Sequence, residues 1–170
     1  MTFEEFAAAR LPAVLKFAAV LTGDRSLAED VVQEVLIRAN ARWQLIGSVP
    51  RPEAYVRKMI VNEYLASRRR SWRMVLSGAG SDIEGPPTPD PAAGYAEREA
   101  MLAELGKLPR RQRAVVVLRY YEGLSFQEIA EVLGCTPGTA RGHASRALAG
   151  LRIELARPPL PRPVVIKEEF

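Results

Sequence analysis

The sequence predicts an all-α protein that consists of two small helical domains, residues 1–74 and 96–153, joined by a flexible linker at 75–95. Apolar residues recur at helical spacing in both halves, and Ser-x-x-Glu patterns mark the starts of helices. Proline and glycine cluster between the halves, in SGAGSDIEGPPTPDPAAG. This stretch has too few apolar side chains to offset the entropy lost on ordering, so we expect it to separate two domains.

The composition is that of a soluble protein. No apolar run approaches the roughly 20 residues that span a bilayer, and MTFEEFAAARLPAV carries two glutamates before any basic residue, unlike a secretory signal. One cysteine cannot form an internal disulfide, which fits a reducing compartment. We therefore expect a cytoplasmic protein without membrane insertion, which ends in a proline-rich tail, residues 154–170.

Charge is distributed unevenly along the chain, although the formal net charge is only +4. Acidic residues outnumber basic ones up to Val35, whereas seven bases between Arg51 and Arg73 face only Glu53 and Glu63. This asymmetry indicates a polyanionic partner for the basic stretch. On charge alone, a solvated surface explains the stretch equally well.

The segment SLAEDVVQEVLIRANARW is predicted to be an amphipathic helix. Ser26 stands where an N-cap is expected, and Glu29 completes a capping box. A rotation of about 100° per residue gathers the apolar side chains into one stripe: Leu27, Ala28, Val31, Val35 and Ala39. The opposite face carries Asp30, Gln33, Glu34 and Ile37. Taken alone, these residues favour a solvated face over the alternative, a docking surface.

After the loop QLIGSVP, the segment RPEAYVRKMIVNEYLASRRRSWR is predicted to be a further amphipathic helix. Its apolar positions are Tyr55, Met59, Ile60 and Leu65, and strand alternation fails at the continuous run MIV. Basic side chains alternate with Tyr55, Tyr64 and Trp72. Such a helix can pair with phosphates and stack on unpaired bases. The alternative is that the three aromatic residues belong to the core or its rim.

Capping signals also divide the second half into helices. YAEREAMLAELGKL is expected to end near Gly106, and PRRQRAVVVLRYYEGL to begin with Pro109 at its first position and to end at Gly123. SFQEIAEVL begins with a Ser125–Glu128 capping box and ends at Gly134. Thr136 and Pro137 then provide the N-cap and first residue of the last helix.

The last two helices match a DNA-binding helix-turn-helix, with a purely structural helical hairpin as the alternative. Ala130 is small where the second helix crosses, and Gly134 stands where the turn favours a positive φ. The inward positions are Ile129, Leu133, Cys135 and Ala140. The exposed early face of the last helix carries Thr136, Gly138, Thr139, Arg141, Gly142, Ser145 and Arg146, and arginine and hydroxyl side chains can bond base edges. Further phosphate contacts are expected from Arg110, Arg111, Arg113 and Arg119.

Both halves resemble the extracytoplasmic-function sigma factors, the two-domain members of the bacterial sigma-70 family. AEDVVQEVLIRANARW is similar to the core-binding helix of sigma region 2, and AYVRKMIVNEYLASRRR is similar to its promoter-melting helix. LPRRQRAVVVLRYYEGLSFQEIAEVLGCTPGTARGHASRALAGLR is similar to sigma region 4. The resemblance implies region 2 at 1–74 and region 4 at 96–153.

The resemblance further implies a transcription initiation factor that binds the core of bacterial RNA polymerase, recognises promoters and melts DNA. It assigns the polymerase contact to Asp30, Gln33 and Glu34, with Ile37 on the same face. Minus-ten recognition and melting fall to Tyr55, Arg57, Lys58, Asn62, Arg68, Arg69 and Arg70, with Tyr55 and Asn62 around the pocket for a flipped base. Minus-thirty-five recognition falls to the helix from Thr136. An anti-sigma factor is an expectation for the family.

An enzyme built on Cys135 or His143, the only cysteine and the only histidine, is not expected. The sequence has no glycine-rich phosphate loop, no paired carboxylates and no second histidine or cysteine to complete a metal site. We expect no catalytic residue, metal or cofactor, with Cys135 buried and His143 half-buried. The alternative function is a helix-turn-helix regulator that acts without polymerase, which leaves the face around Asp30 unexplained.

Overall fold

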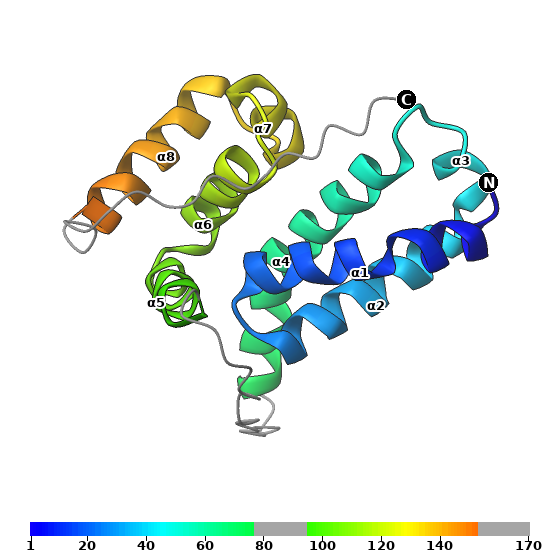
Figure 1. Ribbon diagram of the computed structural model, residues 1–170, viewed down its shortest axis with the longest axis horizontal. Coiled ribbons are helices and arrows are strands. Elements are labelled where there is room, and N and C mark those ends of the chain that lie inside the picture. Colours follow the sequence, from blue (N-terminus) through cyan, green and yellow to red (C-terminus); the bar gives the residue numbers. More distant parts are fainter. Residues whose placement is uncertain (77–94, 153–170) are drawn as a thin grey trace. The chain divides into compact units, whose positions relative to one another are not determined.

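The computed structural model describes the backbone of residues 1–76 and 95–152, and the side chains of residues 1–67 and 100–151. The chain divides into two compact units, Met1–Gly106 and Lys107–Phe170 (Figure 1). Every regular element in the described ranges is helical, so the predicted all-α fold is confirmed. The predicted tail and nearly all of the predicted linker lie outside the described residues, and the predicted domain bounds stay a prediction.

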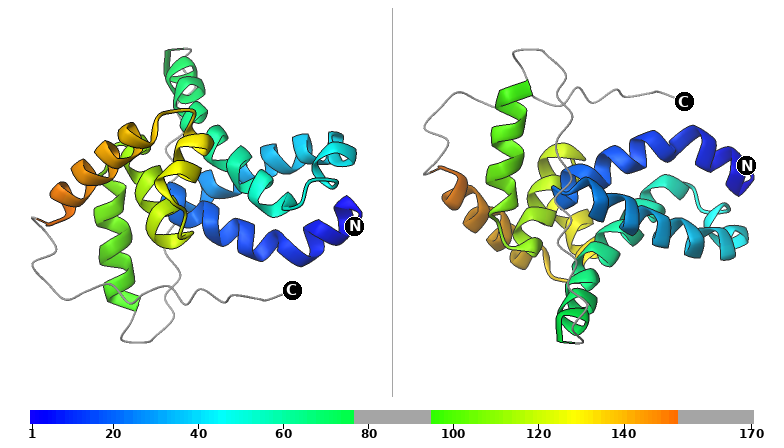
Figure 2. Two further views of the ribbon diagram at one scale, coloured as in Figure 1. Left: turned by 90° about the horizontal axis from the view of Figure 1, so that it is seen from above. Right: turned by 90° about the horizontal axis from the view of Figure 1, so that it is seen from below.

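Three long helices build the first unit: α1 (Phe3–Thr22), α2 (Arg25–Ala41) and α4 (Pro52–Leu76). α1 and α2 run antiparallel and side by side, and α4 packs against both of them (Figures 1 and 2). Their buried faces form one apolar core, with Phe6, Val14, Phe17 and Leu21 from α1, Val31, Val32 and Val35 from α2, and Val56, Ile60, Val61 and Tyr64 from α4.

The starts of the first two helices differ from the prediction. A capping box between Thr2 and Glu5 begins α1, a helix that the sequence analysis did not identify. The predicted capping box of Ser26 with Glu29 is wrong, because Asp24 is the N-cap of α2 and its Oδ1 accepts from the Leu27 N–H at 2.9 Å. Asp24 directly follows the turn at the end of α1, so it is extended where the next helix must begin.

A short helix, α3 (Trp43–Ile46), replaces part of the predicted loop. The indole Nε1 of Trp43 donates to the carbonyl of Met1 at 3.0 Å, and its ring packs edge-on against Phe3 at 5.5 Å between centroids. A Cβ on Gly47 would lie 2.9 Å from that Nε1, so glycine lets the indole lie against the backbone. The chain after α2 is thereby fixed to the start of α1.

The second unit contains α6 (Arg110–Val116), a π-helical turn η1 (Val117–Tyr121), α7 (Phe126–Leu133) and α8 (Pro137–Arg152). α6 and α7 both pack on α8. Pro109 is the N-cap of α6 rather than its first residue, and the π-helical turn was not predicted. The preceding helix, α5 (Tyr95–Gly106), ends at Gly106 as predicted.

The helix-turn-helix prediction is confirmed in its local geometry. Ser125 and Glu128 form the expected capping box, and Gly134 has a φ of 63°. The Oγ1 of Thr136 accepts from the Thr139 N–H at 3.1 Å, which caps α8. The inward positions Ile129, Ala130, Leu133 and Ala140 are buried, whereas Cys135 is only half-buried.

Replacing Gly134 by Ala is expected to destabilise the second unit by about 1–2 kcal/mol, because a Cβ is strained at positive φ. Gly138→Ala is the matched control, since that glycine lies within α8 and a Cβ there would meet only the Thr136 hydroxyl at 3.8 Å. Chemical denaturation followed by far-ultraviolet circular dichroism measures both variants. Equal losses of stability would contradict the prediction.

Candidate nucleic-acid interface and docking face

The face of α2 that was predicted to dock a partner is directed away from the core of its unit. Asp30, Gln33 and Ile37 are exposed, and Ile37 exposes 61% of its surface. Glu34 lies on the same face and is half-buried. The residues of this docking face (Asp30, Gln33, Glu34 and Ile37) are therefore brought together, with an apolar side chain between acidic and amide groups.

Glu34 is connected to α4 through an arginine. The Nε of Arg38 lies 3.7 Å from a carboxylate oxygen of Glu34, and its Nη2 lies 2.5 Å from the carboxylate of Glu63. Glu63 is buried and Glu34 is not, so Arg38 bridges a surface carboxylate and an interior one. The docking face and α4 thus share one guanidinium. Sequence spacing alone gives no sign of this contact across 25 positions.

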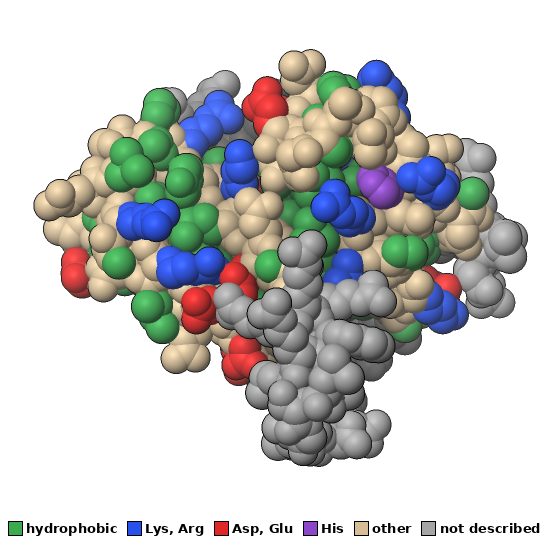
Figure 3. Space-filling model, turned by 180° about the vertical axis from the view of Figure 1, so that it is seen from behind, with side chains coloured by type: hydrophobic (Ala, Val, Ile, Leu, Met, Phe, Trp, Pro, Cys, Tyr) green, Lys and Arg blue, Asp and Glu red, His purple; other side chains and the backbone are tan. Residues whose placement is uncertain are grey.

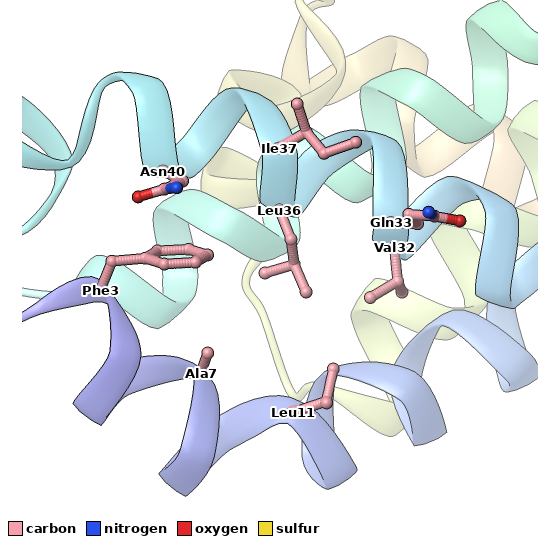
Figure 4. A pocket seen from close by; sticks show the side chains of 8 residues that line it. All are labelled: Phe3, Ala7, Leu11, Val32, Gln33, Leu36, Ile37 and Asn40. Carbon is pink, nitrogen blue, oxygen red and sulfur yellow. The ribbon is translucent and has the colours of Figure 1, made fainter.

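A shallow apolar groove lies beside the docking face, between α1 and α2. It has a volume of about 340 Å³. Figure 4 shows Phe3, Ala7 and Leu11 of α1 opposite Val32 and Leu36 of α2, with Ile37 at the rim directed away from α1. Gln33 and Asn40 complete the lining. The groove was not predicted; the signal for it in the sequence is the stripe Phe3, Ala7 and Leu11, at a spacing of four residues.

On α4, three of the residues predicted to contact the minus-ten element form a solvent-exposed face. Tyr55, Lys58 and Asn62 are all exposed, and their spacing of three and four residues places them on one side of the helix. Tyr64 is 3% exposed and belongs to the core, as the alternative interpretation had it. The side chains of Arg68, Arg69, Arg70 and Trp72 lie outside the described residues.

Arg57 does not lie with this exposed face. Its Nη2 donates to the carboxylate of Glu53 at 2.5 Å, and its guanidinium lies 5.4 Å from the centroid of the Phe17 ring. The Nε of Arg10 lies 3.3 Å from the other oxygen of Glu53. Arg10, Glu53 and Arg57 therefore connect α1 to α4, and Arg57 faces the helix pair that packs on α4 rather than solvent.

The exposed face of α8 carries most of the predicted base-reading residues. Thr136, Gly138, Thr139, Arg141, Ser145 and Arg146 are exposed, and Gly142 is half-buried. The opposite side of the helix is a stripe of Ala140, Ala144 and Ala147, all buried. The predicted side chains are thus gathered on one surface of the second unit.

Two arginines that precede the helix-turn-helix are engaged within the fold. Arg113 is 3% exposed, so the prediction that it contacts phosphate is wrong. Arg119 donates from Nη1 to the carbonyl of Leu124 at 2.8 Å, and its guanidinium lies 4.8 Å from the centroid of the Phe126 ring. Arg119 thereby fixes the connection into α7. Arg111 is exposed.

His143 lies at the edge of the exposed face of α8. Its Nδ1 lies 3.3 Å from the Nη2 of Arg146, and because a guanidinium only donates, the imidazole nitrogen accepts. Partial burial lowers the pKa of His143 from 6.5, and the positive charges of Arg146 and Arg111 lower it further. The imidazole is therefore neutral at neutral pH, with its proton on Nε2.

Within the described ranges, no helix combines the length and apolar character needed to cross a membrane. No group of three or more histidine, cysteine, aspartate or glutamate side chains that could hold a metal ion occurs among those residues either.

Two family models match the chain. Sigma-70 region 2 matches residues 6–74, and Sigma-70, region 4 matches residues 98–151. The first match contains α2 and the exposed face of α4, and the second contains the helix-turn-helix. The chain is therefore a protein of the sigma-70 class.

Similar proteins narrow this class. The RNA polymerase sigma-E factor of Streptomyces coelicolor is 33% identical over 171 residues, which cover 99% of this chain and 94% of the relative. The ECF RNA polymerase sigma factor SigL of Mycobacterium tuberculosis is 34% identical over 143 residues, 82% of this chain and 81% of the relative. The chain belongs to the extracytoplasmic-function sigma factors, and it is a promoter-specificity factor that binds RNA polymerase.

Solved structures agree with this assignment. The sigma factor RpoE of Bartonella quintana, in complex with the anti-sigma factor NepR, matches with a TM-score of 0.72 at 28% identity, covering 91% of this chain and 98% of RpoE. CnrH, in complex with the cytosolic domain of CnrY, shares the fold with a TM-score of 0.57 at 24% identity, over 90% of this chain and 86% of CnrH.

Acidification is expected to destabilise α8 through His143. Because the pKa of His143 in the folded state is lower than the unfolded value of about 6.5, the unfolded state binds the proton more tightly, and the stability present above that pH is lost as the pH falls through the folded pKa. Hydrogen exchange of peptides from α8, compared between wild type and His143→Gln at equal pH, measures this difference. An identical pH dependence in both proteins would contradict the prediction.

Proposed function

We propose that residues 1–74 act as sigma region 2 and residues 96–153 as sigma region 4 in transcription initiation. In this role the docking face of α2 binds core polymerase, the exposed face of α4 receives the minus-ten element, and the exposed face of α8 reads the minus-thirty-five element. The family matches at 6–74 and 98–151 support these bounds. The single observation that carries the proposal is that most of the predicted side chains described on α2, α4 and α8 are exposed, on the side of each helix opposite the core.

The docking face has the composition of a protein interface rather than of ordinary surface. Ile37 is a large apolar side chain that is mostly exposed. Asp30 and Gln33 lie beside it, and their carboxylate and amide oxygens can accept hydrogen bonds from a partner. An exposed apolar anchor with polar neighbours is the usual arrangement of a binding hot spot. Because Asp30 and Glu34 are acidic, the complementary surface on polymerase is expected to be basic.

The exposed face of α4 provides the groups that capture unpaired DNA. Tyr55 offers a ring on which a base stacks, Asn62 can bond the edge of a flipped base, and Lys58 can bind the backbone. Melting costs roughly 1–2 kcal/mol for each stacked step, and such contacts offset that cost. Arg57 acts in this proposal by holding α4 against α1, since Glu53 and Phe17 occupy its guanidinium.

These roles require no covalent chemistry of the chain, so we infer that the protein is not an enzyme and uses no cofactor. Because its partners are RNA polymerase and promoter DNA, we place it in the cytoplasm. RpoE of Bartonella quintana is known in complex with the anti-sigma factor NepR, which supports an anti-sigma factor for this chain as well. A helix-turn-helix regulator without polymerase is not favoured, because it leaves the docking face without a role.

The proposal is tested by run-off transcription with bacterial core RNA polymerase on a promoter library. The expected result is transcripts that require this protein and start at a shared promoter sequence. Binding of the chain to palindromic duplex DNA, without any complex with core polymerase, would refute the proposal.

Asp30→Arg is expected to weaken core binding by about tenfold or more, because it places a positive charge against a basic partner. Asp30 is preferred to Glu34, whose replacement would also disturb Arg38 and the buried Glu63. The control is Glu29→Arg, the same charge change on an adjacent side of α2, where Glu29 pairs with the exposed Arg25. Affinity for core polymerase measures both, and equal effects would contradict the docking face.

Arg141→Ala is expected to cost about 1–3 kcal/mol of discrimination between promoter sequences if its guanidinium reaches a base edge. Arg141 is exposed, and its guanidinium lies 5.9 Å from the centroid of the Phe126 ring, which restricts its orientation. Binding of holoenzyme to matched and mismatched minus-thirty-five elements measures the effect. Equal weakening on both sequences would show that Arg141 contacts only phosphate.

A further inference from the structure

We propose that Arg111, His143 and Arg146 form a binding site for one phosphate of the DNA backbone, and that His143 takes up a proton when this site is filled. The proposal rests on the proposed function, since it takes promoter DNA as the ligand. It adds a site and a dependence on pH that the family assignment does not contain.

The three side chains come from two packed helices. His143 and Arg146 lie three residues apart on α8, and Arg111 is on α6, which packs on α8. A Cβ on Gly142 would lie 3.8 Å from the Nη2 of Arg146, so this guanidinium lies across Gly142 and beside the imidazole. Figure 3 shows the histidine, in purple, with Lys or Arg side chains on both sides of it.

The site lacks a negative charge. Arg111 and Arg146 form no ion pair within the described part of the chain. The charged groups that act on the imidazole are Arg146 from its own helix and Arg111 from α6, and none from α7 is among them. Two guanidiniums without an ion pair, one beside the imidazole and one near enough to act on its charge, are suited to a phosphate, whose oxygens accept charge-assisted hydrogen bonds.

Binding of a phosphate changes the favoured protonation state of the His143 imidazole. Without phosphate, its Nδ1 accepts from Arg146 and the ring is neutral. A phosphate accepts the guanidinium hydrogens and brings a negative charge, which favours the charged imidazole. On protonation Nδ1 becomes a donor, so it no longer holds Arg146, and both side chains can donate to the phosphate. The proton comes from solvent, and no bond between heavy atoms is made or broken.

The location of the site indicates a backbone contact rather than a base contact. His143 is half-buried at the margin of α8, whereas Thr139, Arg141 and Ser145 are exposed on the face that is directed outward. Arg146, which the sequence predicted to read bases, lies against His143 and is assigned here to the backbone instead. A recognition helix reads bases with its outward face, and residues at its margin and on the preceding helix meet phosphates. The contribution is therefore expected to be the same for every DNA sequence.

Proton uptake by His143 and DNA binding are expected to favour each other. If phosphate raises the pKa of His143, the complex holds more protons than the free protein, so DNA affinity increases as the pH falls. Each unit by which the pKa rises corresponds to about a tenfold gain in affinity across the titration.

The single histidine makes the test direct. Proton nuclear magnetic resonance of the full chain gives one imidazole Cε1–H signal, which is titrated against pH with and without a saturating duplex of random sequence. We expect a pKa below 6.5 in the free protein and a higher one with DNA. Replacing Arg146 by Gln should remove the DNA-induced rise. An unchanged pKa in the DNA complex would overturn the proposal.

A second readout is DNA affinity, measured by fluorescence anisotropy with a labelled duplex at about pH 8 and about pH 6. Wild type is expected to bind more tightly at the lower pH, and His143→Gln should show a smaller change. Arg146→Gln should lower the slope of log affinity against log salt by about one phosphate contact. The control Arg25→Gln removes an equal charge from a side chain that is 88% exposed in the other unit, and should keep the wild-type pH dependence.

The outcomes separate this site from the proposed function. DNA binding whose pH dependence is the same in wild type and His143→Gln would overturn the phosphate site and leave the promoter-reading role intact. Absence of DNA binding at both pH values would overturn the site together with the role of α8.

Discussion

Close packing of α2 on two sides is the constraint on which the first unit depends. This helix contacts both α1 and α4, and its buried side chains are Ala28, Val31, Val32, Val35 and Ala39, none of them larger than valine. Small side chains let two neighbours approach the same helix closely, and interiors at this density do not tolerate added volume. Only one side of α2 is left for solvent, so the core itself determines which residues form the docking face.

Charged side chains of the first unit hold its helices together. Arg38 joins Glu34 to the buried Glu63, and Glu53 joins Arg10 of α1 to Arg57 of α4. The Arg38–Glu63 pair is costly to break, because removing Arg38 strands the charge of the buried Glu63. The basic residues thus divide into arginines that shape the fold and cations left at the surface, such as Lys58 and Arg111.

The sequence was sufficient for what depends on local pattern. The helix-turn-helix was predicted closely because caps and glycines are local signals: Ser125 with Glu128, Gly134 at positive φ, and Thr136 before Pro137. The opposed faces of α2 also followed, since periodicity alone determines them. The resemblance to sigma factors was confirmed by the family matches, and the roles of these faces stay a proposal.

What the sequence could not give depends on contacts between distant positions. Two good N-cap residues, Asp24 and Ser26, compete at the start of α2, and only the turn that follows α1 decides between them. In the sequence, Arg57 and Arg113 were predicted to contact DNA. Packing instead places Arg57 against Glu53 and Phe17 and buries Arg113. The groove between α1 and α2 likewise exists only once the two helices are paired.

The alanine stripe on α8 has a consequence for how this protein changes over evolutionary time. Ala140, Ala144 and Ala147 meet the rest of the unit, whereas Thr139, Arg141 and Ser145 do not contribute to its core. Substitutions on the outward side therefore carry little penalty in folding free energy, because they remove no buried contact. Such a helix can acquire a new DNA preference by exchanging a few side chains, while the scaffold that presents them stays the same.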